Sequence, residues 1–404
     1  MSRFEYRCTE CGRTYDRDAV RYLCPTCGES HAPGQPLRGV LEAVFDAEFL
    51  TDASDPGQPD WSRFSAVESS HFPDFPVGNT PLAPAPGLGA ELGLDDLWIK
   101  NDGLNPSGSL KDRASFLMVA EARRLGEDRL IAASTGNAAS ALAAVCAASG
   151  KQALIFVPEN APRAKLVQML LHGARVVRVK GSYDDAFRLS LEYTRERGGL
   201  NRNTAYHPLT IEGKKTVSLE IFAQLKGTVP DSVIVPVGDG VIISGVHKGF
   251  ADLRRAGLAE RLPRLFCVQA ERSDAIHHLI TTGEYRNANN PATVADSISV
   301  SAPSNARMAA RAVQESQGGS VVVPDEAILA AQVRLARGAG VFAEPAAAAA
   351  AAGLEALVAQ GRIERGERTV LLVTGHGLKD IDAPLARLAL PDPVEPDLAA
   401  LGEA

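Results

Sequence analysis

The chain has 404 residues, of which 45% are hydrophobic and 23% charged, and its formal net charge is −7. This length suggests two or three domains, and the composition is that of a folded globular protein rather than a disordered one. The negative charge argues against a nucleic-acid surface, which needs clustered Lys and Arg. The polar N-terminus and the short apolar run Ala346–Ala352 argue against a signal peptide or membrane span, so we expect a cytoplasmic protein.

Four cysteines near the N-terminus have the spacing of a zinc site. They form the pattern C-x2-C-x12-C-x2-C and are Cys8, Cys11, Cys24 and Cys27. Four thiolates at this spacing can bind zinc tetrahedrally, and two disulfides are the alternative, which a reducing cytosol disfavours. Because four protein ligands leave no open position on the metal, we expect a structural, zinc-ribbon-like knuckle within residues 1–40.

The segments that follow the knuckle predict an α/β fold. Residues 53–90 are rich in Pro, Gly and Ser and are expected to form an irregular arm. From Leu97 onward, β-branched strand-like runs alternate with amphipathic stretches. The expected strands are Val176–Lys180, Asp231–Gly238, Arg264–Ala270 and Thr369–Gly375, and the expected helices are Asp112–Leu125, Ala164–His172 and Tyr183–Arg197. Such alternation predicts parallel sheets with helices on both faces.

Two short motifs lie at predicted helix starts, where α/β folds bind ligands. Residues 105–113 (NPSGSLKDR) place Lys111 just before a helix. A lysine nucleophile must be held still and partly desolvated, although a solvated lysine at a helix start is the simpler alternative. Residues 134–138 (STGNA) precede a helix of small residues, whose free amides could bind a carboxylate; a plain N-cap at Ser134 or Thr135 is the alternative.

Two further motifs follow predicted strands. Residues 235–245 (VPVGDGVIISG) run from a strand through a Gly-rich turn into a helix, so backbone N–H groups could converge on a phosphate. An ordinary strand-to-helix turn would show the same pattern. Residues 374–380 (TGHGLKD) follow an apolar strand, and the hydroxyl of Thr374 could contact a heteroaromatic nitrogen, with a simple turn as the alternative.

Four motifs, in their order along the chain, resemble those of threonine synthases, which are pyridoxal-phosphate enzymes of the tryptophan-synthase-β-like fold, fold type II. These motifs are NPSGSLKDR, STGNAAS, VGDGVIISG and TGHGLKD. The resemblance extends from about Phe75 to Asp380, and a CxxC pair is also met near the N-terminus of threonine-synthase-like proteins. It implies two parallel-sheet α/β domains beside the knuckle. We expect a large domain from residues 41–114 and 211–390, a small domain from residues 115–210 that closes over the cofactor, and a tail at 391–404.

The resemblance also implies a role for each motif. Lys111 would form the Schiff base with pyridoxal 5′-phosphate and act as the catalytic acid and base, Asn137 would bind the 3′-oxygen of the ring, and Thr374 would face the ring nitrogen. The residues that would bind the cofactor phosphate are Gly238, Asp239, Gly240, Val241 and Ile242. The residues that would bind the substrate carboxylate are Ser134, Thr135, Gly136, Asn137 and Ala138.

The leading functional prediction is threonine synthase, which converts O-phosphohomoserine and water to threonine and phosphate. The turn Gly238–Ile242 and the segment Thr293–Val300 (TVADSISV) are closer to threonine dehydratases, so an ammonia-lyase acting on threonine or serine is the first alternative. Arg163 and Lys165 are the candidates for binding a substrate phosphate, with solvated surface charges as the alternative.

A non-catalytic zinc-knuckle binding protein is an alternative of another class. The presence of Lys111, Asn137 and Thr374 together argues against it. The expected partners are a small amino-acid substrate and a second copy of the chain in a homodimer, without nucleic acid or membrane.

Overall fold

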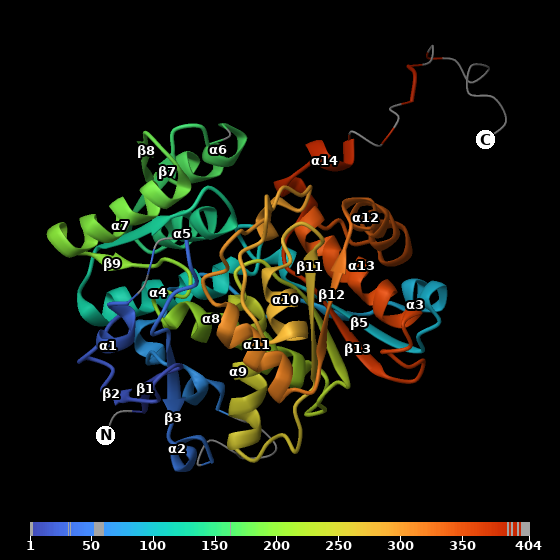
Figure 1. Cartoon of the computed structure of the whole chain (residues 1–404), viewed down its shortest axis with the longest axis horizontal. Coiled ribbons are helices and arrows are strands. Elements are labelled where there is room, and N and C mark those ends of the chain that lie inside the picture. Colours follow the sequence, from blue (N-terminus) through green and yellow to red (C-terminus); the bar gives the residue numbers. More distant parts are fainter. Residues whose placement is uncertain are drawn as a thin grey trace.

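The computed structural model describes residues 3–30, 32, 34–51, 60–161, 163–385, 388, 391–393 and 396, but not the side chains of residues 163–165. An antiparallel sheet of order β2-β1-β3 lies at the N-terminus (Figure 1). Its elements are β1 (Phe4–Cys8), β2 (Thr14–Tyr15) and β3 (Leu41–Phe45), with the short helices α1 (Pro25–Gly28) and α2 (Ala47–Thr51) beside them. The sheet therefore includes residues beyond position 40.

The largest sheet has six strands in the order β12-β11-β10-β13-β5-β4. All neighbours are parallel except β4, which is antiparallel to β5. The strands are β4 (Leu82–Pro84), β5 (Asp96–Asn101), β10 (Ser232–Pro236), β11 (Arg264–Ala270), β12 (Gly319–Val323) and β13 (Arg368–Val373). In β10, Val233 and Val235 face one hydrophobic core and Ile234 faces another, so the sheet is buried on both faces, as parallel sheets require.

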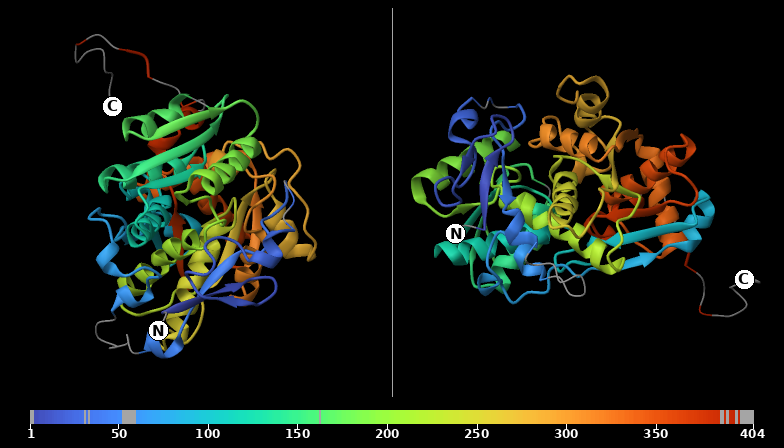
Figure 2. Two further views of the ribbon diagram at one scale, coloured as in Figure 1. Left: turned by 90° about the vertical axis from the view of Figure 1, so that its left-hand side faces the viewer. Right: turned by 90° about the horizontal axis from the view of Figure 1, so that it is seen from below.

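Helices cover both faces of this sheet, as the views in Figures 1 and 2 show. One face packs against α8 (Leu209–Gln224), α9 (Val241–Arg255), α10 (Ala275–Thr282) and α11 (Ala306–Glu315). The other packs against α3 (Pro86–Leu92), α12 (Asp325–Ala339) and α13 (Pro345–Ala359). The alanine run 346–352 lies in α13 and is wholly buried, and a Cβ at Gly353 would lie 2.3 Å from a methyl carbon of Val268. The small residues therefore let α13 lie close against the strands.

A second, four-stranded parallel sheet has the order β8-β7-β6-β9. Its strands are β6 (Arg129–Ala133), β7 (Gln152–Pro158), β8 (Arg175–Val179) and β9 (Leu200–Asn201). The helices in this part of the chain are α5 (Asn137–Ala148), α6 (Arg163–Leu171) and α7 (Tyr183–Arg197), and α4 (Lys111–Leu125) contacts both α5 and α8. In β6, Leu130 faces the core shared with α4 and α5, whereas Ile131 faces α7.

The α/β fold with parallel sheets is confirmed. The strand Arg264–Ala270 and the helix Tyr183–Arg197 have the expected bounds, and the other expected elements differ by one or two residues at an end. The large sheet also has one antiparallel strand, β4, at its edge. One expectation is wrong, because the expected irregular arm contains β4 and α3 as well as short 3-10 turns at Trp61–Phe64 and Ser69–His71.

The remaining elements lie toward the C-terminus or in connecting loops. They are 3-10 turns at Asp102–Leu104, Asp296–Ile298 and Gly377–Lys379, and the short helix α14 (Asp382–Leu385). Within the described residues, every helix is too short or too polar to span a bilayer. Residues 52–59 of the expected arm and most of the expected tail 391–404 lie outside the described residues.

Candidate active site

Lys111 is the first residue of α4, and the loop before it pairs with the segment after β13. The backbone N–H of Leu110 donates to the carbonyl of Thr374 at 2.9 Å, and the N–H of His376 donates to the carbonyl of Gly108 at 3.0 Å. Gly108 has a φ of +84°, which favours glycine at this bend. The first and fourth sequence motifs therefore lie side by side at the carboxyl end of a central strand, where α/β sheets bind ligands.

Buried ion pairs fix the helix that carries Lys111. The guanidinium of Arg113 donates to the Asp102 carboxylate at 2.6 and 2.8 Å and to the Glu220 carboxylate at 2.6 Å. The ammonium of Lys100 donates to the other oxygen of Glu220, also at 2.6 Å. Since Asp102 follows β5 and Glu220 lies in α8, these contacts hold the start of α4 against the large sheet.

The environment of Lys111 favours a reactive amine. Burial lowers the pKa of Lys111, and the nearby carboxylate of Glu344 opposes this effect in part. Among the described residues, its ammonium nitrogen has no hydrogen-bond partner. A lysine whose pKa is lowered by burial has a larger neutral fraction at a given pH, and the neutral amine is the nucleophile.

The second motif, residues 134–138, contacts the rest of the site through Glu344. The side-chain amide of Asn137 donates to both carboxylate oxygens of Glu344 at 3.0 Å, and Ser297 lies 3.5 Å from the same amide. Glu344 precedes α13 and is buried, which raises its pKa. A Cβ at Gly375 would lie 2.2 Å from this carboxylate, so a larger residue there would have to displace it. In the sequence, Glu344 and Pro345 suggest either a contact with the cofactor region or simply the start of a helix, and the structure places Glu344 between two of the motifs.

The Gly-rich turn 238–242 joins β10 to α9. A Cβ at Gly238 would lie 2.9 Å from the Cα of Ile298, so the turn packs closely on its neighbour. The carboxylate of Asp239 accepts the N–H of Ser304 at 3.2 Å and its hydroxyl at 3.1 Å, which holds the turn in place. Gly240 precedes the helix with a φ of +84°.

Backbone N–H groups are available at this turn. The first four N–H groups of an α-helix have no partner within the helix, and α9 begins at Val241. The N–H groups of Val241 and Ile242 therefore lie where an anion would be stabilised by the helix N-terminus. The turn has the backbone geometry for a phosphate, as the sequence pattern indicated, but its occupancy by the cofactor phosphate stays a prediction.

The residues expected to bind the substrate carboxylate lie between β6 and α5. Ser134, Thr135, Gly136 and Ala138 are half-buried, whereas the Asn137 side chain is buried. A pocket beside this loop is lined by Gly136, Asn137, Glu344 and Lys379, among others. Lys379 comes from the fourth motif and donates to the hydroxyl of Ser140 at 3.0 Å and to the side chain of Gln168 at 2.7 Å.

Arg163 and Lys165 belong to α6, but their side chains lie outside the described residues. Their assignment to a substrate phosphate is therefore still a prediction.

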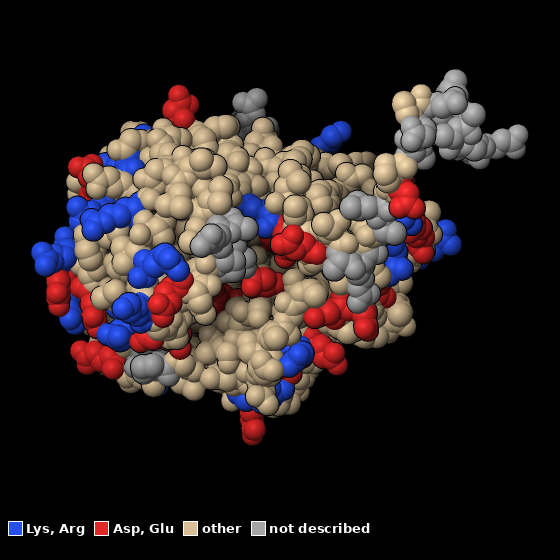
Figure 3. Space-filling view, turned by 90° about the horizontal axis from the view of Figure 1, so that it is seen from above, with Lys and Arg blue, Asp and Glu red and all other residues tan. Residues whose placement is uncertain are grey.

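Viewed from above, the surface is hollowed near its centre (Figure 3). Acidic side chains lie beside the hollow, whereas acidic and basic side chains are mixed along the margins of this face and uncharged residues cover most of its upper part.

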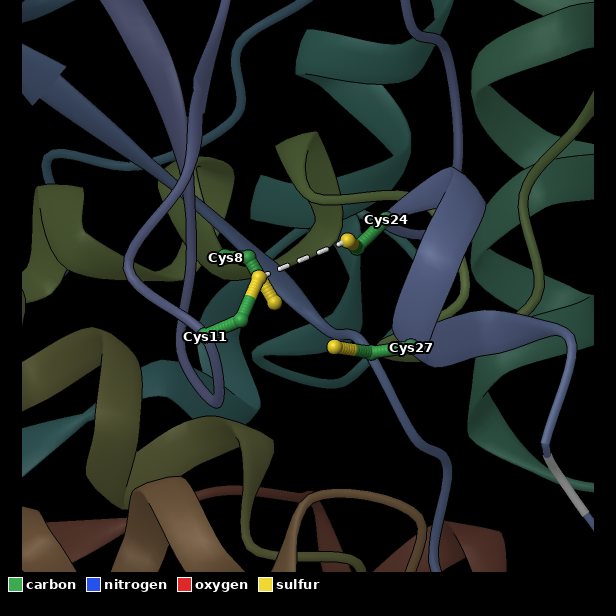
Figure 4. A group of neighbouring side chains, drawn as sticks. All are labelled: Cys8, Cys11, Cys24 and Cys27. Atoms are coloured by element: carbon green, nitrogen blue, oxygen red, sulfur yellow. Dashed lines mark hydrogen bonds between the residues drawn. The ribbon is translucent and has the colours of Figure 1, made fainter.

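The four N-terminal cysteines converge from β1, the turn after it and α1 (Figure 4). Their sulfur atoms all lie within 4.8 Å of one another, and none of the four is in a disulfide. The Cys11 and Cys24 sulfurs are 3.8 Å apart. Zinc–sulfur bonds of about 2.3 Å in a tetrahedron place sulfurs about 3.8 Å from one another, so the cluster has dimensions that suit zinc.

Tyr22, which lies between the two cysteine pairs, contacts the segment after β9. Its ring stacks on Tyr206 with centroids 4.6 Å apart and meets His207 edge-on at 5.5 Å. Its hydroxyl accepts the backbone N–H of Asn201 at 3.1 Å. The cysteine cluster is therefore tied directly to the end of the small sheet.

Three features meet at the carboxyl ends of parallel strands. They are a half-buried lysine, a Gly-rich turn at a helix start and a buried carboxylate–amide pair. Together they define an α/β enzyme built to hold a phosphate-bearing aldehyde cofactor. Residues 74–375 match the family model of pyridoxal-phosphate dependent enzymes. The chain is 37% identical to the threonine synthase of Methanocaldococcus jannaschii, over 98% of each chain, and 35% identical to that of Methanosarcina acetivorans, over 99% of this chain and 98% of the other.

Among solved structures, threonine deaminase isoform 2 from Solanum lycopersicum is similar with a TM-score of 0.67 and 25% identity. The match covers 77% of this chain and 87% of that one. The chain belongs to the threonine synthase family of pyridoxal-phosphate-dependent enzymes.

Proposed function

We propose that the protein is a threonine synthase, which converts O-phosphohomoserine and water to threonine and phosphate. The observation that carries the proposal is the 37% identity to a threonine synthase over 98% of both chains. The unmatched 2% of each chain is too short to form a domain. The second candidate is a threonine or serine ammonia-lyase. It is favoured by the similarity to a threonine deaminase structure and by Asp239 in the Gly-rich turn.

The residues present fit pyridoxal 5′-phosphate. Lys111 offers an amine without a hydrogen-bond partner among the described residues, and the turn 238–242 offers N–H groups for a phosphate. Asn137 would bind the 3′-oxygen, and the buried Thr374 would face the ring nitrogen. When bound, the cofactor supplies an electron sink that stabilises negative charge at the substrate's Cα.

The chain's own residues would bind the substrate and move its protons. Ser134–Ala138 would bind the carboxylate at the start of α5, and Lys111 would carry protons among Cα, Cβ and Cγ. Over the reaction, the Cγ–O bond breaks and its electron pair leaves with the phosphate. Cβ loses one proton and becomes bonded to the hydroxyl of a water molecule, while Cγ gains a proton in place of the oxygen. The remaining proton of the water goes to the released phosphate. Arg163 and Lys165 are proposed to attract the substrate phosphate.

The test compares two products of the purified holoenzyme. We expect phosphate release from O-phosphohomoserine, with threonine formed in equal amount, and little 2-oxobutyrate from threonine. Rapid formation of 2-oxobutyrate from threonine without phosphate release from O-phosphohomoserine would replace the proposal with the ammonia-lyase.

We also propose a structural zinc ion bound by Cys8, Cys11, Cys24 and Cys27. Elemental analysis should give about one zinc per chain, because four thiolates complete its coordination. Cys11→Ser should lower the zinc content, whereas Cys146→Ala, a substitution of a buried thiol outside the cluster, should not. A metal-free wild-type protein whose four thiols react at once would contradict the proposal.

The remaining proposals concern the assembly and its place in the cell. We propose a cytoplasmic homodimer, because reducing conditions keep the four thiols available for zinc and two-fold dimers are the commonest soluble assemblies. Light scattering should give twice the chain mass of 42.7 kDa. The domain division, with residues 1–40 as the knuckle, 41–114 and 211–390 as the large domain and 115–210 as the small one, is a further proposal that limited proteolysis can test.

A further inference from the structure

One side chain of α6 contacts both the first and the fourth motif. The amide oxygen of Gln168 accepts from the ammonium of Lys379 at 2.7 Å, and its amide nitrogen donates to the backbone carbonyl of Ser107 at 3.2 Å. These partners lie 211 and 61 residues away from Gln168 in the chain. An amide suits this position, because it carries an acceptor and a donor in one side chain.

Lys379 makes a second contact, with the start of α5. Its ammonium donates to the hydroxyl of Ser140 at 3.0 Å, and that hydroxyl donates to the backbone carbonyl of Asn137 at 3.3 Å. Asn137 is the first residue of α5 and belongs to the loop Ser134–Ala138, which is proposed to bind the substrate carboxylate. Two successive hydrogen bonds therefore connect this loop to the fourth motif.

The stem of Lys379 also packs against the first motif. A Cβ at Gly108 would lie 3.1 Å from the Cε of Lys379, so the absence of a side chain at Gly108 makes room for the stem. Lys379 lines the same pocket as Gly136 and Asn137. A single side chain thus touches the loop before Lys111, the start of α5 and, through Gln168, α6.

The charge of Lys379 is placed where stability alone does not favour it. The side chain is half-buried and its hydrogen-bond partners are neutral, and among the described residues it forms no ion pair, although Glu344 and Asp380 line the same pocket. Ser140 lies in the first turns of α5, near the positive end of the helix dipole, which repels a cation. An anion bound at the start of α5 would attract both the helix end and the ammonium.

We propose that Lys379 and Gln168 are positioning residues for the amino-acid substrate. They hold the start of α5 in a fixed place relative to the first and fourth motifs, so that the carboxylate and the reacting carbons are oriented together. The ammonium also adds positive charge beside the bound carboxylate. The proposal rests on the proposed function only in part, because threonine enters this site in both candidate functions, as product or as substrate.

The test measures the binding of L-threonine to the holoenzyme through the change in cofactor absorbance. Lys379→Met removes the charge and both of its hydrogen bonds but keeps an unbranched side chain. Loss of hydrogen bonds to a charged group should weaken threonine binding about 10- to 150-fold. Gln168→Met removes one of the two bonds and should weaken binding about 10-fold. Cofactor content and melting temperature should stay close to those of wild type.

Two further variants distinguish positioning from a general loss of structure. Because Lys379 and Gln168 share one hydrogen bond, the double methionine variant should lose clearly less affinity than the product of the two single effects. Lys379→Arg keeps the charge and should restore part of the affinity. If Gln168→Met does not fold, Lys379→Met and Lys379→Arg carry the test.

Lys151→Met is the matched control. Lys151 precedes β7 and pairs at 2.7 Å with Asp128, which precedes β6. Because β6 and β7 are parallel, this pair lies at the amino ends of the strands, at the opposite edge of the small sheet from the loop Ser134–Ala138. The substitution removes the same charge and should leave threonine affinity unchanged.

Three results would overturn the proposal. They are unchanged threonine affinity in Lys379→Met, independent effects that multiply in the double variant, and loss of cofactor or a lower melting temperature in both single variants, which would make the contacts structural. The proposed function fails separately. If the variants behave as expected but wild type releases no phosphate from O-phosphohomoserine, the positioning role stands and the threonine synthase assignment falls.

Discussion

Replacing Glu220 with Gln tests the ion-pair network that fixes the start of α4. Burial alone would raise the pKa of Glu220, but hydrogen bonds and charge from Arg113 and Lys100 outweigh burial and lower it from 4.5 to about 2. The Glu220 side chain is 21% exposed, so solvent screens these contacts only in part. Its ionisation is therefore coupled to folding.

The direction of the pH effect follows from the lowered pKa. Ionised Glu220 stabilises the folded state fully above its unfolded pKa of about 4.5, and this contribution is lost as the pH falls toward about 2. The difference between the two pKa values corresponds to about 3 kcal/mol. Removing one partner of a buried ion pair typically costs about 3–5 kcal/mol, so Glu220→Gln should lower the free energy of unfolding at pH 7 by about 3 kcal/mol.

Urea titrations at pH 7, 4.5, 3 and 2.5 measure this effect. Wild type should lose more stability than Glu220→Gln between pH 4.5 and 2.5. Glu192→Gln is the control, because Glu192 forms an exposed pair with Arg188 and should change stability by less than about 1 kcal/mol. Parallel pH profiles for wild type and Glu220→Gln, or a loss below about 1 kcal/mol at pH 7, would refute the reasoning.

Two further substitutions test the centre of the site. The wild-type protein should purify yellow. Lys111→Ala should abolish the borohydride-reducible adduct with the cofactor, while circular dichroism shows an unchanged fold. An equal amount of adduct in the variant would contradict the assignment of Lys111. Gly375→Ala should displace the Glu344 carboxylate, because the new Cβ would lie 2.2 Å from it, and should lower stability by about 1–3 kcal/mol with an altered cofactor spectrum. Gly366→Ala, where a Cβ meets nothing within 4 Å, is the matched control, and equal effects of the two alanines would reject the steric argument.

Local signals explain which elements were predictable. The helix Tyr183–Arg197 begins with a capping box between Ser182 and Asp185, and its bounds can be read from sequence. The strand Leu82–Pro84 could not be recognised, because it is three residues long and contains a proline. Proline is tolerated there because the strand lies at the edge of its sheet, where one side of the backbone needs no hydrogen-bond partner.

The site residues also differ in whether a local sequence pattern identifies them. Lys111 and the Gly-rich turn lie in short motifs whose pattern indicates their chemistry. Glu344 contacts Asn137 across 207 residues, and its sequence context fits the start of a helix as well as it fits a contact with the cofactor region. Gln168 lies in the helical stretch KLVQMLL, whose pattern does not indicate its contacts with Ser107 and Lys379. Only the packing of α6 beside the two motifs brings these groups together, and sequence patterns do not report that packing.

The contact between Tyr22 and the segment after β9 indicates that residues before the family match contribute to the folded site. A shortened chain starting at residue 60 would retain all four motifs and the whole span of the family match, which begins at residue 74. It would nevertheless uncover the ring of Tyr206 and remove the acceptor for the N–H of Asn201, immediately before Arg202. The N-terminal cysteine cluster thus supports the edge of the small sheet that lies beside Ser134–Ala138. If the proposed assignments are right, Cys11→Ser should weaken substrate binding before it affects the cofactor.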